Sequence, residues 1–358
     1  AAAVAWADPD REAAFHHWLQ GVGEAHGLAP ATLRPASADA SFRRYLRIDG
    51  ATAAAARAPA SFIIMDAPPD KEDCKPFVAV AALMADAGLL VPRVLAWDEA
   101  MGFMLLDDLG AHTMIERVDA ANPAANLPLY QRAVEALVTW QLASRPGVLP
   151  PYDDALLARE LALFPDWYLA RHKGVTLTDA QRTTLDQQFR LIVQHNLAAP
   201  AVHVHRDFMP RNLMMPWDAA EPRLGVLDFQ DAVYGPITYD IASLMRDAFL
   251  SWDEEFVLDV TIRYWEKARK AGLPVGDDFG EFYRAVEWMG LQRHLKVAGI
   301  FARLTLRDGK PKYLADAPRF IQYIRTTAGR YRELAPLLRL VDAIEGTQAA
   351  TGFAFGRV

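Results

Sequence analysis

The sequence of 358 residues contains a single cysteine, Cys74, so no disulfide bond can form within the chain. Disulfide-stabilised scaffolds are thereby excluded, and the composition fits a reducing compartment. Positive charge is also scarce, because 38 basic residues stand against 45 acidic ones and no basic block is present. A protein that binds nucleic acid through its phosphates needs such a block. We therefore expect no nucleic-acid partner.

Long apolar runs are missing as well. No run approaches the roughly 18 residues of a membrane-spanning helix, so we expect no membrane partner. The apolar stretch at residues 1–6 is followed by Asp8, Asp10 and Glu12 and preceded by no basic segment, which is not typical of a secretion signal. With 52% hydrophobic residues the chain can still bury a sizeable core. We expect a cytoplasmic protein that acts as a monomer.

The first hundred residues carry mostly strand patterns. Asp8-Pro9 predicts the start of a helix that runs towards Gly27. A second helix is predicted over 76–87, where apolar residues recur at helical spacing and Gly88 follows. Short apolar or alternating runs predict strands at 42–48, 61–65, 91–97 and 102–106. These elements make a small α+β domain.

After residue 113 most segments outside the region 201–242 have helical spacing. We predict helices at 130–142, 152–172, 179–196, 252–271, 277–304 and 317–340. The change of pattern predicts two domains, a strand-rich domain at residues 1–108 and a mainly helical domain at residues 109–358.

Three polar residues stand out in the helical half. Asp207 is followed by Asn212 five positions later and by Asp228 after a further sixteen, and short apolar runs flank each of them. Short strands fix the ends of loops, so these three side chains are expected to converge. A carboxylate that accepts a proton, beside two oxygen ligands for a hard cation, is what phosphoryl transfer requires.

The motif His205-Arg206-Asp207 with Asn212, followed by Asp228-Phe229, resembles the catalytic loop and metal-binding motif of protein kinase-like enzymes. It is more closely similar to the aminoglycoside phosphotransferase/choline kinase family, whose next segment matches residues 235–242. The resemblance implies a bilobal α+β fold with a small antiparallel-sheet N-lobe and a large, mainly helical C-lobe. It also implies ATP as the phosphoryl donor and Mg²⁺ held by Asn212 and Asp228, with Asp207 as the catalytic residue.

Two further stretches, residues 40–45 and 65–74, resemble one branch of that family, the bacterial sugar kinases of cell-wall recycling. Those enzymes phosphorylate the anomeric hydroxyl of N-acetylmuramate and N-acetylglucosamine. The resemblance therefore implies an amino sugar as substrate and a sugar 1-phosphate as product.

The chain departs from the wider family where the nucleotide phosphates would bind. The loop before Phe42 lacks glycine, so a hydroxyl such as that of Ser41 would face the phosphates, and the strand ending at Met65 lacks the usual lysine. Arg44 is our first candidate to supply the missing positive charge, because strand alternation directs Arg43 to the opposite face. The other candidates for this charge are Arg43, Lys71 and Lys75.

The remaining candidate residues concern the adenine base and the acceptor sugar. The backbone around Asp107 and Leu109 lies where the family's hinge contacts adenine. Gln230 and Asp231 directly follow the metal-binding aspartate and carry groups suited to sugar hydroxyls. A lactyl carboxylate would suit a basic group. The candidates for it are Arg211, Arg246 and His294, with Arg206 and Arg293 as further possibilities.

Several alternatives stay open at this point. His203-Val204-His205 places two imidazoles on one face of a strand, which would also suit a zinc-dependent hydrolase. The missing lysine and glycines would suit a module that binds nucleotide or sugar without turnover. The acceptor could also be another small hydroxyl compound of the choline, homoserine or aminoglycoside type.

Overall fold

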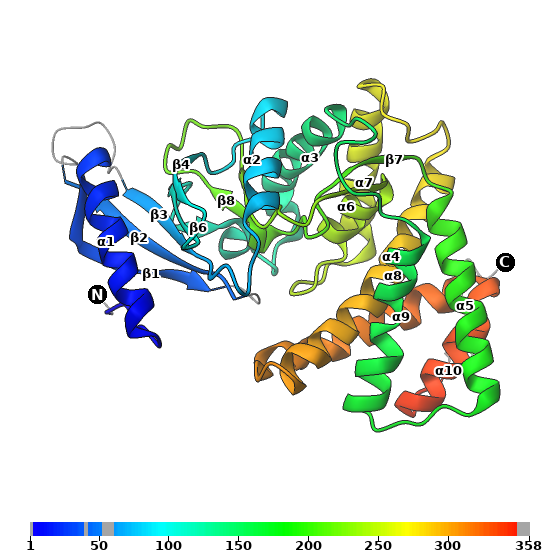
Figure 1. Cartoon of the computed structure of the whole chain (residues 1–358). Helices are drawn as coiled ribbons and strands as arrows, with labels where there is room; N and C mark the ends of the chain where they lie inside the picture. The colour runs from blue at the N-terminus through cyan, green and yellow to red at the C-terminus, as the bar shows by residue number, and fades with distance from the viewer. Residues whose placement is uncertain (1–2, 39–41, 52–60, 349–358) are drawn as a thin grey trace. The chain divides into compact units, whose positions relative to one another are not determined.

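The computed structural model describes residues 3–38, 42–51 and 61–348, so the nucleotide-binding candidate Ser41 lies outside the described residues. The chain divides into two compact units (Figure 1). Unit 1 comprises Ala1–Glu116 and Arg211–Asp231, and unit 2 comprises Arg117–Pro210 and Ala232–Val358. The domain boundary placed after Asp108 from the sequence stays a prediction.

Unit 1 is built on a five-stranded antiparallel sheet in the order β1-β2-β3-β5-β4. Its strands are β1 (Leu28–Ala38), β2 (Arg44–Gly50), β3 (Ser61–Asp66), β4 (Val94–Asp98) and β5 (Phe103–Asp107). Helix α1 (Pro9–His26) packs on this sheet, and the core between them contains Phe15, Leu46, Ile64 and Phe103.

Both helices of unit 1 begin and end close to the predicted residues. The Asp8 side chain accepts a hydrogen bond from the backbone of Asp10, which caps α1, and Gly27 ends the helix at φ 65°. Helix α2 (Lys75–Ala87) ends at Gly88, whose φ of 98° few other residues adopt.

A segment from the middle of the chain completes unit 1. Strands β8 (Leu213–Met215) and β9 (Gly225–Val226) pair with β6 (His112–Thr113) in a three-stranded sheet. The backbone N–H of Val226 donates to the carbonyl of Leu90 at 2.8 Å, and the ring of Phe77 on α2 lies 4.9 Å from that of Phe229. These contacts fix the residues around Asp228 to the strand-rich part of the chain.

Unit 2 is mainly helical. Its α-helices are α3 (Leu127–Leu142), α4 (Asp154–Leu161), α5 (Asp179–Leu197), α6 (Thr238–Met245), α7 (Glu254–Lys270), α8 (Phe279–Leu306), α9 (Ala317–Arg330) and α10 (Ala335–Glu345). Strands β7 (Ala201–Val204) and β10 (Val233–Pro236) form an antiparallel pair. The short 3₁₀ turns of the chain are η2 (Met114–Arg117), η3 (Pro123–Asn126), η5 (Pro210–Asn212), η6 (Pro311–Asp316) and η7 (Arg332–Leu334).

Two of the predicted helices are each split in the structure. The helix predicted over 152–172 consists of α4 and a π-helix, η4 (Phe164–His172), and Pro165 in the first turn of η4 has no N–H for an α-helical hydrogen bond. The helix predicted over 317–340 is interrupted at Tyr331, whose backbone is extended, and Pro336 suits the first turn of the helix that follows.

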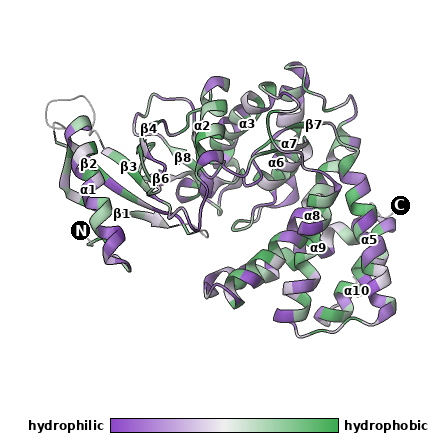
Figure 2. Cartoon of the chain, in the orientation of Figure 1, coloured by the Kyte–Doolittle hydropathy of each residue, from purple (hydrophilic) through white to green (hydrophobic). Residues whose placement is uncertain are grey.

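The helices of unit 2 carry hydrophobic and hydrophilic residues side by side (Figure 2). In α9, for example, Phe320, Ile321 and Ile324 are buried, while Arg319 and Gln322 lie on the partly exposed or exposed side. Within the described residues, no helix combines the length and apolarity needed to cross a membrane.

Candidate active site

The loop that carries Asp207 leaves strand β7 and is held by a buried carboxylate of α6. Asp240, 1% exposed, accepts the backbone N–H of His205 at 2.7 Å and that of Arg206 at 3.0 Å. Arg206 has a φ of 86°, which is strained for a residue with a side chain and persists only where its surroundings fix it. Burial raises the pKa of Asp240 to about 7, although the two N–H groups oppose this.

Asp207 itself is ionised and accessible. Its backbone N–H donates to Nδ1 of His205 at 3.1 Å, and its side chain is 41% exposed. Arg293 on α8 places Nη2 3.5 Å from Oδ1 of Asp207. Desolvation by itself would raise the pKa of Asp207, but the positive charges of Lys296 and Arg293 outweigh it and lower this pKa. A carboxylate in this state can accept a proton.

The predicted metal ligands, Asn212 and Asp228, lie together in unit 1. Nδ2 of Asn212 is 3.4 Å from Oδ2 of Asp228, and the backbone N–H of Leu227 donates to the carbonyl of Asn212 at 2.9 Å. Asp228 lies two residues after β9 and has a φ of 57°, so its backbone conformation is strained as well. Nε2 of Gln230 donates to Oδ1 of Asp228 at 2.7 Å.

This pair fits a magnesium ion by the chemistry of its donors. Mg²⁺ prefers oxygen ligands, and a carboxylate with a carboxamide oxygen supplies them with only one negative charge. The amide of Asn212 can present either its oxygen or its nitrogen, because rotation by half a turn exchanges the two. Among the described residues, no group of three or more His, Cys, Asp or Glu side chains that could hold a metal ion is found.

The arginine chosen from strand alternation has another partner. Arg44 donates to Oδ2 of Asp66 at 2.6 Å and to the carbonyl of Ala5, and its guanidinium lies over the ring of Trp6. Arg43, which is 6% exposed, instead places Nη2 3.6 Å from Oδ1 of Asp228. Strand β2 begins only at Arg44, so the alternation rule does not apply to Arg43. The structure therefore favours Arg43 as the cation near the metal ligands, and a nucleotide contact of Arg44 stays a prediction.

The two hinge residues belong to unit 1. Asp107 ends β5, and its carboxylate accepts a hydrogen bond from Nε of Arg93 at 2.8 Å. The side chain of Leu109 lies against Gly225, where a Cβ atom would come within 2.9 Å of it. Their predicted contacts with adenine are made by the backbone and stay predictions.

The candidate sugar-binding residues lie in different surroundings. Asp231 is exposed and Arg211 is partly exposed, whereas Gln230 has a buried Oε1 atom without a hydrogen-bond partner. Arg246 is buried, and its Nη2 lies 3.5 Å from a carboxylate oxygen of Glu287. Because Arg246 is buried and already contacts Glu287, which also pairs with Arg330 at 2.6 Å, it is a weak candidate for a substrate carboxylate.

His294 is fully buried on α8, and its Nε2 lies 3.2 Å from the carbonyl oxygen of Arg246. Burial, with the nearby charge of Arg246, holds the pKa of His294 well below its usual value. The imidazole is therefore neutral, which does not suit it to binding an anion.

The two histidines that suggested a zinc hydrolase have other partners. Nε2 of His203 accepts the backbone N–H of Arg145 at 3.1 Å, and Nδ1 of His205 accepts that of Asp207. His203 thus supports the backbone at Arg145 and His205 that of the loop of Asp207, which disfavours a zinc site at this position.

Sequence patterns did not identify three residues that support the loop of Asp207 from distant parts of the chain. Asp240, Glu160 and Lys296 form buried contacts around the loop of Asp207, and none is near it in the chain. Only the segment 239–242 carried a signal, through its resemblance to the family motif. No spacing rule connects Glu160 or Lys296 to Asp207.

Comparison with known proteins identifies relatives of this chain. Residues 32–276 match the model of the phosphotransferase enzyme family. An N-acetylmuramate/N-acetylglucosamine kinase of Pseudomonas aeruginosa is 50% identical over 92% of this chain and 93% of its own length. An enzyme of the same name from Neisseria meningitidis is 48% identical over 96% of this chain and 99% of its own length.

A solved structure shows the same fold. An ADP-bound aminoglycoside phosphotransferase matches with a TM-score of 0.56 at 14% identity, over 86% of this chain and 97% of its own. The predicted α+β protein kinase-like fold, with its antiparallel sheet and its helical remainder, is thereby confirmed. With a family model that matches most of its length, this chain belongs to the phosphotransferase enzyme family.

Proposed function

We propose that this protein is an ATP-dependent sugar kinase that phosphorylates the anomeric hydroxyl of N-acetylmuramate and N-acetylglucosamine. The product would be the sugar 1-phosphate, formed during the recycling of peptidoglycan. The observation that carries the proposal is the ionised, accessible Asp207 on a loop that Asp240 holds by two backbone hydrogen bonds. The identity of about 50% to kinases named for these two sugars supports the choice of substrate.

Asp207 would act as the proton acceptor. As the anomeric oxygen bonds to the γ-phosphorus of ATP, its proton passes to the carboxylate of Asp207 and the bond to the ADP oxygen breaks. The low pKa of Asp207, set by Lys296 and Arg293 against the effect of desolvation, keeps the acceptor ionised at neutral pH. Its 41% exposure leaves room for a substrate hydroxyl.

Asn212 and Asp228 would hold Mg²⁺, which neutralises part of the charge on the donor phosphates. Gln230 fixes the orientation of Asp228 through its hydrogen bond to Oδ1. Arg43 would supply positive charge in place of the absent strand lysine, because it is buried beside Asp228.

We further propose that the enzyme works as a cytoplasmic monomer, where ATP is supplied, with nucleotide contacts from Ser41, Arg44 and the backbone of Asp107 and Leu109. Gln230, Asp231 and Arg211 are the candidates for contacts with the sugar. The neutral His294 and the paired Arg246 are then framework residues of α8 and α6.

The test is to incubate the protein with ATP and Mg²⁺ in the presence of N-acetylmuramate, N-acetylglucosamine, choline or an aminoglycoside. We expect ADP release with the two amino sugars and, by ³¹P NMR, a phosphate on carbon 1. Phosphate on another acceptor would identify another small-molecule kinase. Nucleotide or sugar binding without any ADP release would identify a non-catalytic module.

Replacement of the proton acceptor tests the mechanism. We expect Asp207→Asn to lower kcat by about 10²- to 10⁴-fold, because an amide cannot take the proton. Asp259→Asn is a matched control, since Asp259 is an exposed residue of α7 that pairs with Arg263 on the same helix. Unchanged turnover in Asp207→Asn would show that another group accepts the proton.

A further inference from the structure

Glu160 on α4 is a buried carboxylate that the proton transfer does not use. It accepts hydrogen bonds from the hydroxyl of Tyr152 at 2.6 Å, from Nζ of Lys296 at 2.7 Å and from the guanidinium of Arg206. Burial would raise the pKa of Glu160, but Lys296 and Arg206 outweigh it and lower this pKa. One anion thus lies between two cations inside unit 2.

The partner Arg206 is the residue immediately before Asp207. Its backbone N–H is bound by Asp240, and its guanidinium is bound by Glu160, so it is held at both ends. The side chain of Arg206 is 18% exposed and that of Glu160 is 7% exposed, so water screens the pair little. The φ of 86° at Arg206 requires such support, because a side chain disfavours this conformation.

Glu160 is in turn fixed relative to the strands that carry the loop. The backbone N–H of Tyr152 donates to the carbonyl of Tyr234 at 2.8 Å. Gly235 on β10 lies against Tyr152 so closely that a Cβ atom there would be 2.6 Å from the Cβ of Tyr152. Since β10 pairs with β7, the strand before the loop, Tyr152 links Glu160 to the origin of the loop.

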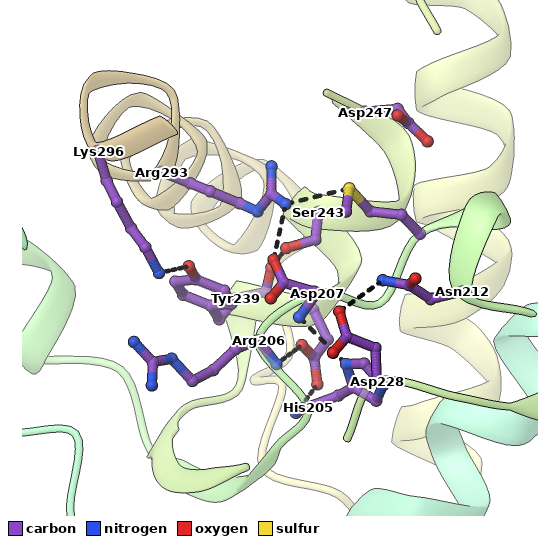
Figure 3. A network of polar contacts seen from close by, with 12 residues as sticks. His205, Arg206, Asp207, Asn212, Asp228, Tyr239, Ser243, Asp247, Arg293 and Lys296 are labelled. Atoms are coloured by element: carbon purple, nitrogen blue, oxygen red, sulfur yellow. Dashed lines mark hydrogen bonds and ion pairs between the residues drawn. The ribbon is translucent and has the colours of Figure 1, made fainter. Parts of the chain in front are cut away.

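The second cation, Lys296, extends the cluster to α8. Its Nζ also lies 3.2 Å from the hydroxyl of Tyr239, which precedes Asp240 on α6 (Figure 3). The rings of Tyr152 and Tyr239 are 5.4 Å apart, so both tyrosines pack against each other beside the charged groups. Residues of α4 and α6 therefore bind the residue before Asp207 directly, and Lys296 of α8 binds Glu160 and Tyr239 behind it.

We propose that Glu160 is a positioning residue: a built-in counter-anion for Arg206 that sets the orientation of the catalytic loop and so of Asp207. The inference rests on the proposed function. It implies that the loop is ordered by the chain's own carboxylate and needs no added charged group to become competent.

The test is Glu160→Gln, which keeps the size of the side chain and removes its charge. We expect kcat to fall by about 10²-fold, the effect of a misplaced catalytic group, with KM for ATP and for the sugar within about two-fold of wild type. The matched control is Glu135→Gln, because Glu135 forms an exposed pair with Lys267 at 2.8 Å and exposed pairs contribute little. Unchanged kcat in folded Glu160→Gln overturns the inference.

A second comparison separates positioning from folding, since Glu160→Gln leaves two buried cations without their anion. The double variant Glu160→Gln/Lys296→Met removes one charge of each sign and is compared with Lys296→Met alone. We expect kcat of the double variant to be at least about ten-fold lower than kcat of Lys296→Met, at similar KM. Equal kcat in the two overturns the inference, and so does loss of the circular dichroism signal in both Glu160 variants but not in Lys296→Met.

The activity of the wild type distinguishes failure of the proposed function from failure of the inference about Glu160. If the wild type makes no sugar phosphate, the proposed function fails, and this inference fails with it. If the wild type is active and Glu160→Gln is equally active, the inference alone fails.

Discussion

At the scale of single residues, the charge on Asp207 depends on a helix far along the chain. Arg293 on α8 is 1% exposed, and two of its nitrogens, Nε and Nη1, are buried without a hydrogen-bond partner in the described structure. Its contacts are Asp207 and the sulfur of Met209. A buried guanidinium with so few partners acts on Asp207 mainly through its positive charge.

Replacement of Arg293 should therefore change the pH dependence of the reaction. In Arg293→Met the pKa of Asp207 should rise, because a positive charge that lowers it is removed, so the carboxylate becomes protonated, and activity is lost, at a higher pH as the pH falls. Asp240, whose pKa Arg293 also lowers, should shift in the same direction. The measurement is the acid limb of the profile of kcat against pH.

Arg293→Lys is the control, because it keeps a positive charge on α8. Its acid limb should stay close to that of the wild type, and identical profiles for the two variants would contradict the argument. The other titratable or charged groups that act on Asp207 remain in both variants, namely Lys296, His205, Arg206 and Asp240.

At the scale of elements, α8 packs against the π-helix η4 at Gly299. A Cβ atom at this position would lie 2.3 Å from the backbone carbon and oxygen of Leu163. Backbone atoms cannot move aside as the end of a side chain can. Gly299 therefore permits the close approach of η4 to the helix that carries Arg293 and Lys296.

We expect Gly299→Ala to destabilise the protein by about 2 kcal/mol or more, because the methyl group forces the two elements apart. Gly21→Ala on α1 is the control, since no atom lies within 4 Å of the added methyl group and alanine favours a helix. Urea unfolding followed by circular dichroism measures both. Equal midpoints for the two variants would show that η4 can shift at little cost.

At the scale of the whole molecule, the chain leaves unit 2 and enters unit 1 between Pro210 and Arg211, inside the segment that carries Asp207, Asn212 and Asp228. Asp207 belongs to unit 2, whereas Asn212 and Asp228 belong to unit 1 through residues 211–231. The proton acceptor and the proposed metal ligands are therefore supported by different cores. A change in one set should leave the fold around the other intact.

This arrangement predicts a selective effect of Asp228→Ala. The variant should fold, but Mg²⁺ should no longer increase the thermal stabilisation by ATP, because the metal loses its carboxylate. In the wild type, ATP with Mg²⁺ at about 100 times Kd should stabilise by about 2.7 kcal/mol, and chelation of the metal should reduce this. Thermal unfolding with and without EDTA is the measurement.

Asp86→Ala on α2 is a control for the same unit, since Asp86 is exposed. It should respond to Mg²⁺ and ATP as the wild type does. A magnesium-dependent shift that survives in Asp228→Ala would contradict the assignment of Asp228 as a metal ligand.

The sequence alone determined the features that local patterns encode. Asp8-Pro9 and Gly27 marked the ends of α1 because capping depends on adjacent residues. Alternation and short apolar runs indicated β2 to β5 of the antiparallel sheet but not β1, and the spacing of Asp207, Asn212 and Asp228 indicated phosphoryl transfer. Helix interruptions at Pro165 and Tyr331 were missed, since the apolar spacing continues across both.

Only the tertiary structure decided which charges meet. Arg43 rather than Arg44 lies beside Asp228, because β2 begins two residues later than alternation assumed. Glu160 and Arg206 are 46 residues apart in the chain, so no local spacing rule connects them. A buried ion pair forms where helices and strands pack together, and its partners are set by that packing rather than by their separation in sequence.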